Sequence, residues 1–144
     1  MFKNILLAFD GSDHSRKAAL VTGQLARQQQ PPALVRITVA VQPIYRGWGE
    51  PNFTEVASKR AIEGQELLDS AAKLVGGQGG PEIEVHTELL FGPAADEIIN
   101  VAEVRGCDLI VMGTRGLGAL RGLLLGSQTQ KVISHAHCPV MVIR

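Results

Sequence analysis

The chain has 144 residues with 14 basic and 14 acidic side chains, so its formal net charge is zero, and 45% of its residues are hydrophobic. A chain of this size and apolar content can bury a core without disulfides or metals. The zero charge without a cluster of Lys or Arg argues against a nucleic-acid binder, and no apolar run approaches the roughly 20 residues that cross a bilayer. We predict a single domain over residues 1–144 that resides in the cytoplasm, with Cys107 and Cys138 reduced.

The first half of the chain alternates between short continuous apolar runs and stretches with helical spacing, which is typical of a parallel α/β sheet. Residues 5–9 are apolar at every position, and this pattern predicts a central strand covered on both faces. The sequence Asp10-Gly11-Ser12-Asp13 then signals a turn and a helix start. We expect a helix from Ser15 to about Gln28 and a second strand over residues 34–41.

The second half of the chain continues the same alternation. Residues 42–54 contain the only Trp and Tyr among Pro and Gly and are predicted to form a loop. A long helix is expected over residues 55–75, and alternation over residues 82–89 predicts a strand at a sheet edge with one wet face. Next we expect a helix from Gly92-Pro93 to Arg105 and a strand over residues 109–112. A glycine-rich stretch over residues 113–126 follows, and the chain ends with a short helix over 127–135 and a final strand over 139–143.

Five parallel strands joined by right-handed crossovers form a doubly wound sheet with helices on both faces. In such sheets, ligands bind at the carboxyl ends of the strands where the winding direction reverses. With the strand order 3-2-1-4-5, this reversal falls between the first and fourth strands. Asp10 and Gly113 would then face one crevice.

The stretch from Gly113 to Ser127 contains five glycines in fifteen residues. Glycine lets backbone N–H groups approach an anion closely, and a helix with Ser127 as its N-cap would direct further N–H groups toward the crevice. These features favour a phosphate ligand. The stretch is not a Walker loop, because the chain has no Gly-Lys pair, and its spacing differs from the dinucleotide fingerprint. A ligand-free loop kept small for packing is the alternative.

Three segments together resemble the universal stress protein family over essentially the whole chain. They are the pattern Gly113-x2-Gly116-x9-Gly126-Ser127, the turn Asp10-Gly11-Ser12 and the final Cys138-Pro139-Val140-Met141-Val142-Ile143. The resemblance implies an adenine-nucleotide-binding α/β fold with strand order 3-2-1-4-5. It also implies a role in the stress response and, usually, a homodimer.

The resemblance also assigns roles to individual residues. Gly113, Gly116, Gly126 and Ser127 would hold the phosphates and ribose of ATP, ADP or AMP. Asp10 would lie beside the nucleotide or bind Mg²⁺, Val41 would read adenine through its backbone, and Gly11 and Ser12 would complete the first loop. Independently of the resemblance, Arg115 in the glycine-rich stretch is expected either to contact phosphate or to remain solvated. Gln128 is included among the binding residues, although the family usually has a smaller residue there, which bears on the packing of the first helical turn.

Two other functions stay open. A slow Mg²⁺-dependent ATPase is suggested by Asp10, but no nucleophile and base with an orienting partner can be identified. A nucleotide-free dimeric interaction module is suggested by the apolar final strand, because a hydrophobic edge strand needs a partner. We expect a homodimer that pairs these edges. Zinc at His135, His137 and Cys138 is disfavoured because no second ligand pair is visible.

Overall fold

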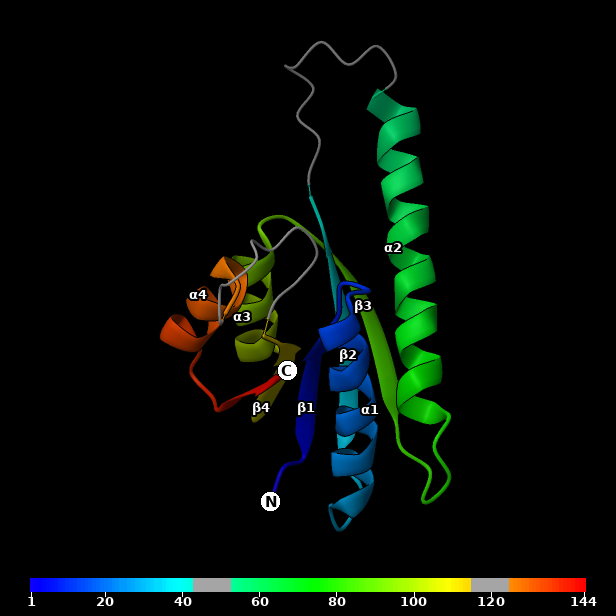
Figure 1. Cartoon of the computed structure of the whole chain (residues 1–144), viewed down its shortest axis with the longest axis vertical. Coiled ribbons are helices and arrows are strands. Elements are labelled where there is room, and N and C mark those ends of the chain that lie inside the picture. The colour runs from blue at the N-terminus through cyan, green and yellow to red at the C-terminus, as the bar shows by residue number, and fades with distance from the viewer. Residues whose placement is uncertain (43–52, 115–124) are drawn as a thin grey trace.

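A computed structural model describes residues 1–42, 53–114 and 125–144 and contains one five-stranded parallel sheet (Figure 1). The strand order is β3-β2-β1-β4-β5, so the predicted doubly wound sheet with order 3-2-1-4-5 is confirmed. The elements in chain order are β1 (Asn4–Ala8), α1 (Asp13–Gln28), β2 (Leu34–Val41), α2 (Phe53–Gly76), β3 (Val85–Phe91), α3 (Ala94–Val104), β4 (Leu109–Gly113), α4 (Ser127–His135) and β5 (Val140–Ile143).

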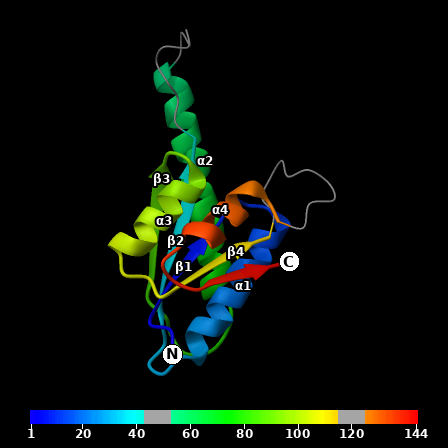
Figure 2. The ribbon, with the colours of Figure 1, turned by 90° about the vertical axis from the view of Figure 1, so that its left-hand side faces the viewer.

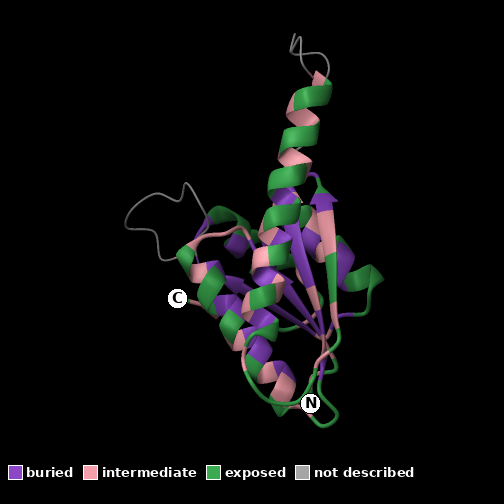
Figure 3. Cartoon of the chain, turned by 90° about the vertical axis from the view of Figure 1, so that its right-hand side faces the viewer, coloured by how far each residue is buried: buried purple, intermediate pink, exposed green. Residues whose placement is uncertain are grey.

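Helices cover both faces of the sheet (Figure 2), and each face has its own apolar cluster. Ile5 and Leu7 of β1 pack with residues of α1 and α2, whereas Leu6 and Ala8 pack with residues of α3 and α4. Successive side chains of a strand point to opposite faces. The continuous apolar run of β1 is therefore explained by burial on both faces, which Figure 3 shows along the centre of the sheet.

The strand β3 lies at the sheet edge, as predicted, but spans Val85–Phe91 rather than residues 82–89. His86 is exposed, as expected for the wet face, whereas Thr87 on the predicted apolar face is exposed as well. Farther along, Leu89 packs with the cluster under α2, and Leu90 is buried in the cluster under α3. The predicted alternation therefore holds at His86 and Leu89 and fails at Thr87, and Leu90, beyond the predicted range, is buried because α3 covers that face of the strand's carboxyl end.

Helix α2 rises beyond the carboxyl edge of the sheet (Figure 1). It lies against the sheet closely at Gly64, where an added Cβ would be 2.5 Å from Leu89 Cδ1 and 3.0 Å from Val41 Cγ2. A larger residue at this position would force the side chains of Leu89 and Val41 to move. The predicted loop with Tyr45 and Trp48 falls largely on residues 43–52, which lie outside the described residues, and α2 starts at Phe53, two residues before the predicted start.

Within the described residues, none of the helices combines the length and the apolar character needed to cross a bilayer.

Candidate functional site

The carboxyl ends of β1 and β4 lie side by side at the point where the winding reverses. The two strands pair in parallel, with Leu7 opposite Val111, so Asp10 after β1 and Gly113 at the end of β4 share one edge. A Cβ added to Gly113 would lie 2.7 Å from His14 Cβ and 3.0 Å from the backbone nitrogen of Ser15. The start of α1 therefore packs directly on the start of the glycine-rich stretch, at the position expected for a ligand site.

The loop after β1 fixes the carboxylate of Asp10. Its Oδ1 accepts a hydrogen bond from the backbone N–H of Ser12 at 2.9 Å, and Gly11 between them has φ +83°, a left-handed conformation that favours glycine. Ser12 is the N-cap of α1, and its Oγ accepts from the N–H of Ser15 at 3.3 Å. The structure thus holds Asp10 in a defined orientation beside a helix N-terminus, where negative charge is stabilised.

Thr114, directly after β4, connects three segments of this edge. Its Oγ1 lies 2.8 Å from His14 Nδ1, its N–H donates to the Ile143 carbonyl at 2.8 Å, and its carbonyl accepts from the Gly126 N–H at 2.7 Å. Thr114 is buried, so these bonds satisfy polar groups that would otherwise be costly to bury. The contact with His14 could not be predicted from the sequence, because the two residues are 100 positions apart.

Helix α4 begins differently from the prediction. We expected Ser127 as the N-cap, but Gly126 takes that place, with extended backbone angles of φ −69° and ψ 158°. The Gly126 carbonyl accepts the first helical bond, from the N–H of Gln130 at 3.0 Å. Ser127 is therefore the first residue inside the helix. The reason is that the bond from the Gly126 N–H to Thr114 holds Gly126 outside the helix.

The start of α4 has unused hydrogen-bonding capacity. Its N-cap, Gly126, has no side chain to cap the helix, and the first N–H groups of any helix lack intrahelical partners. Ser127 is exposed, and within the described parts of the chain its hydroxyl has no hydrogen-bond partner. A helix N-terminus with free N–H groups and a hydroxyl suits an anionic, oxygen-rich ligand.

The three residues after Ser127 are held in place by their side chains. Gln128 Oε1 accepts from the Ala95 N–H at 2.9 Å, Thr129 Oγ1 donates to the Gly113 carbonyl at 3.0 Å, and Gln130 Nε2 donates to the Leu125 carbonyl at 3.1 Å. The first turn of α4 is thus tied to the start of α3, to the end of β4 and to its own preceding loop. This arrangement fixes where the N–H groups of the turn point.

Val41 lies at the end of β2, near the same edge. It is buried, and its carbonyl accepts from the Gly92 N–H at 3.1 Å. A carbonyl oxygen has two lone pairs, so the Val41 carbonyl can accept a second hydrogen bond in addition to the one from Gly92. Two other predicted binding residues, Arg115 and Gly116, lie outside the described residues.

The described side chains do not form a metal centre by themselves. In residues 1–42, 53–114 and 125–144, no group of three or more His, Cys, Asp or Glu residues could hold a metal ion. Mg²⁺ typically keeps several waters and binds one or two carboxylates together with substrate phosphates. Asp10 suits that kind of shared coordination.

The two cysteines do not offer an activated nucleophile. Both are free, and burial raises the pKa of the Cys107 thiol to about 11. Burial also raises the pKa of the Cys138 thiol, with the negative charge of Asp108 adding to the effect. The thiolate is the reactive form of cysteine, so both side chains are poor nucleophiles at neutral pH.

Comparison with known proteins gives a consistent result. A sequence model described as "Universal stress protein family" matches residues 1–144. A universal stress protein of Thermus aquaticus is 42% identical over 144 residues, with both chains covered completely. The solved structure of universal stress protein UspA from Lactobacillus plantarum superposes with a TM-score of 0.85 at 26% identity and covers 99% of this chain and 98% of that one.

Two solved structures with the same fold contain adenine nucleotides. A universal stress protein from Archaeoglobus fulgidus in complex with dAMP has a TM-score of 0.69 at 22% identity, covering 100% of this chain and 98% of that one. A family protein from Arabidopsis thaliana with AMP bound has a TM-score of 0.68 at 19% identity, covering 98% and 90% of the two chains.

Proposed function

The chain belongs to the universal stress protein family, and from this premise we propose that it binds ATP, or ADP or AMP, together with Mg²⁺ at the carboxyl edge of β1 and β4. The observation that carries the proposal is the start of α4. There, Gly126 as the N-cap has no side chain, its N–H is bonded to Thr114, and the hydroxyl of Ser127 has no hydrogen-bond partner among the described residues. The dAMP and AMP complexes of relatives support the choice of an adenine nucleotide.

The roles of the individual residues follow from their places at this edge. The first N–H groups of α4 and the Ser127 hydroxyl would bind phosphate or ribose oxygens. Gly113 and Gly116 would let the backbone come close to the phosphates, with Arg115 beside them. The nucleotide's negative charge is spread over phosphate oxygens, so Mg²⁺ held between them and Asp10 would neutralise it.

The base would lie toward the end of β2. Val41 would offer its backbone to adenine, while Gly11 and Ser12 would border the ribose from the first loop. The bond from Gly92 to the Val41 carbonyl fixes the backbone at this end. A fixed backbone acceptor can distinguish the amino group of adenine from the carbonyl of guanine, because only the amino group donates.

Titration calorimetry with Mg-ATP and with AMP tests this proposal. We expect saturable binding by the natural protein and its loss in Gly116→Val, because a branched side chain blocks the approach of the loop backbone to phosphate. Gly79→Ala is the matched control, since a Cβ at Gly79 meets nothing within 4 Å. Absence of binding by the natural protein would reject the proposal.

We further propose that the protein acts as a cytoplasmic regulator or sensor and forms a homodimer through β5. All four residues of this edge strand are only half-buried, and it pairs with β4 on one side alone. Exposed apolar edges are prone to pair with another chain. A dimer with no nucleotide is the second candidate function, and it would gain support if calorimetry detected no binding.

The oligomeric state tests the role of β5. Sedimentation should show a dimer for the natural protein and a shift toward monomer for Met141→Lys, because a charge on an edge strand opposes pairing. Val104→Lys serves as control, because Val104 is apolar and 71% exposed but lies on α3. A monomeric natural protein, or a dimer unchanged by Met141→Lys, would contradict pairing through β5.

A further inference from the structure

Helix α3 is capped by a residue from another helix. Its N-cap is Pro93, which makes no side-chain capping bond. The N–H of Ala95 in its first turn instead donates to Gln128 Oε1 at 2.9 Å, across 33 positions of sequence. Gln128 thus supplies the acceptor that a local Ser, Thr, Asp or Asn would normally provide.

Gln128 is the tether between α3 and α4 that lies closest to Ser127. The two helices are also joined by an ion pair between Lys131 Nζ and Asp96 Oδ1 at 2.8 Å, but those side chains are 46% and 52% exposed. Exposed ion pairs are screened and contribute little. The hydrogen bond from Gln128 is therefore the stronger of these two polar contacts, and it adds to the apolar packing of Val132 on α3.

The start of α3 is in turn fixed to the end of β2. Gly92 donates its N–H to the Val41 carbonyl at 3.1 Å. Its φ of +147° is unfavourable for other residues, and an added Cβ would lie 2.8 Å from Glu97 Oε1. The turn between β3 and α3 therefore has little freedom, and a continuous path runs from Val41 through Gly92 and Ala95 to Gln128.

We propose that Gln128 is a positioning residue that sets the distance between the phosphate end and the adenine end of the nucleotide site. This inference rests on the function proposed above. Gln128 acts through Ala95: it holds Gly126 and Ser127 at a fixed distance from the backbone of Val41. The amide oxygen faces Ala95 because only an acceptor can pair with that N–H. Gln128 is larger than the residue that the family usually has at this position, and the proposal explains its size by the hydrogen bond to Ala95 and not by contact with the ligand.

The test compares Gln128→Leu, which removes the acceptor at similar size, with Gln128→Glu, which retains an acceptor. Hydrogen exchange of the Ala95 amide by NMR reports the tether, and calorimetry with Mg-ATP reports binding. We expect Gln128→Leu to lose protection at Ala95 and to bind Mg-ATP roughly threefold to tenfold more weakly, which is the scale of one hydrogen bond. Gln128→Glu should keep the protection and bind more tightly than Gln128→Leu.

Lys131→Met is the matched control, because it breaks the other tether between α3 and α4. It should bind Mg-ATP within about twofold of the natural protein, as expected for loss of an exposed ion pair. An equal loss of affinity in Lys131→Met would overturn the positioning role, since any loosening of the two helices would then suffice.

The remaining outcomes are also decisive. Binding by Gln128→Leu within twofold of the natural protein, or an unprotected Ala95 amide in the natural protein, overturns the positioning role alone. A Glu variant that protects Ala95 but binds more weakly than the Leu variant means that the side chain at position 128 acts on the nucleotide through its charge and not through Ala95, which also overturns it. Absence of binding by the natural protein rejects the proposed function and this role together.

Discussion

Two glycine-rich segments lie at opposite edges of the sheet, and they differ in the helix end that they adjoin. Residues 76–80 follow the C-terminus of α2, whereas the stretch that ends at Gly126 precedes the N-terminus of α4. A helix C-terminus presents carbonyl oxygens and partial negative charge, and an N-terminus presents N–H groups and partial positive charge. Similar compositions therefore suit ligands of opposite charge.

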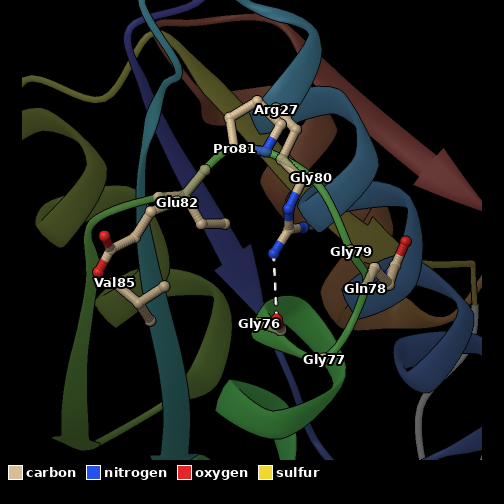
Figure 4. A pocket seen from close by; sticks show the side chains of 10 residues that line it. Arg27, Gly76, Gly77, Gln78, Gly79, Gly80, Pro81, Glu82 and Val85 are labelled. Carbon is tan, nitrogen blue, oxygen red and sulfur yellow. Dashed lines mark hydrogen bonds between the residues drawn. The ribbon is translucent and has the colours of Figure 1, made fainter.

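The carbonyl groups at the C-terminus of α2 already bind a cationic side chain of the protein, Arg27. Arg27 of α1 donates from Nη1 to the Val75 carbonyl at 2.9 Å and from Nη2 to the Gly76 carbonyl at 3.2 Å. Figure 4 shows this guanidinium above the end of α2, beside a hollow of about 450 Å³ lined by Arg27 and by residues of the segment 76–85. The charge of Arg27 is thus directed at carbonyl groups of the protein.

The comparison shows that glycine content alone does not identify a phosphate site. Gly76 and Gly79 would accept a Cβ with nothing within 4 Å, whereas Gly113 has no room for one against His14 and Ser15. In the first segment glycine serves the turn. In the second, Gly113 allows the end of β4 to meet the start of α1 at the edge where a nucleotide is proposed to bind.

Among the variants that test this difference between the two glycine-rich segments, we expect Gly113→Val to change the free energy of unfolding most. The new side chain would collide with the backbone of α1 at His14 and Ser15, so the start of α1 must shift. We expect a loss of about 3 kcal/mol in the free energy of unfolding, the upper part of the range for overpacked sites. Urea denaturation followed by circular dichroism measures it.

Gly79→Ala in the other segment is the control for Gly113→Val. It should change the free energy of unfolding by no more than about 0.5 kcal/mol, as is usual for surface substitutions. Equal losses in the two variants would break the contrast, because the glycines of both segments would then be required by packing.

A smaller effect is expected for Arg27→Met, which keeps most of the apolar side chain but removes the cation at the end of α2. Loss of charged hydrogen bonds to the two carbonyls should lower the free energy of unfolding by about 2 kcal/mol. Thermal unfolding with and without Mg-ATP should give the same nucleotide-induced increase in Tm as in the natural protein. A reduced increase would show that the two edges are not independent.

The elements themselves were largely predictable from local sequence. The all-apolar run of β1 and the helical spacing in α1 and α2 are patterns of a few residues, and burial on one or both faces produces them directly. The bounds of α4, Ser127–His135, agree with the prediction. The bounds of β3 were less predictable, because the strand continues to Phe91, past the predicted end at residue 89, where α2 and α3 cover its opposite faces.

The candidate site was predictable in part. The pairing of β1 with β4 brings Asp10 and Gly113 to one edge as expected. The displaced N-cap at Gly126, the contact of His14 with Thr114 and the bond of Gln128 to Ala95 were not predictable. Each depends on a hydrogen bond between segments that meet only after the sheet has formed.

The sequence by itself determined the alternation of strands and helices, the zero net charge and the glycine-rich motif, because each is a property of composition or of short-range periodicity. Only the tertiary structure decided which hydrogen-bonding groups at the sheet edge are used internally and which stay open. The side chains of Thr114, Thr129 and Gln128 form hydrogen bonds within the protein, whereas the hydroxyl of Ser127 forms none within the described residues. The physical reason is that a hydrogen bond needs its two partners within about 3 Å, and chain folding alone brings such distant residues together.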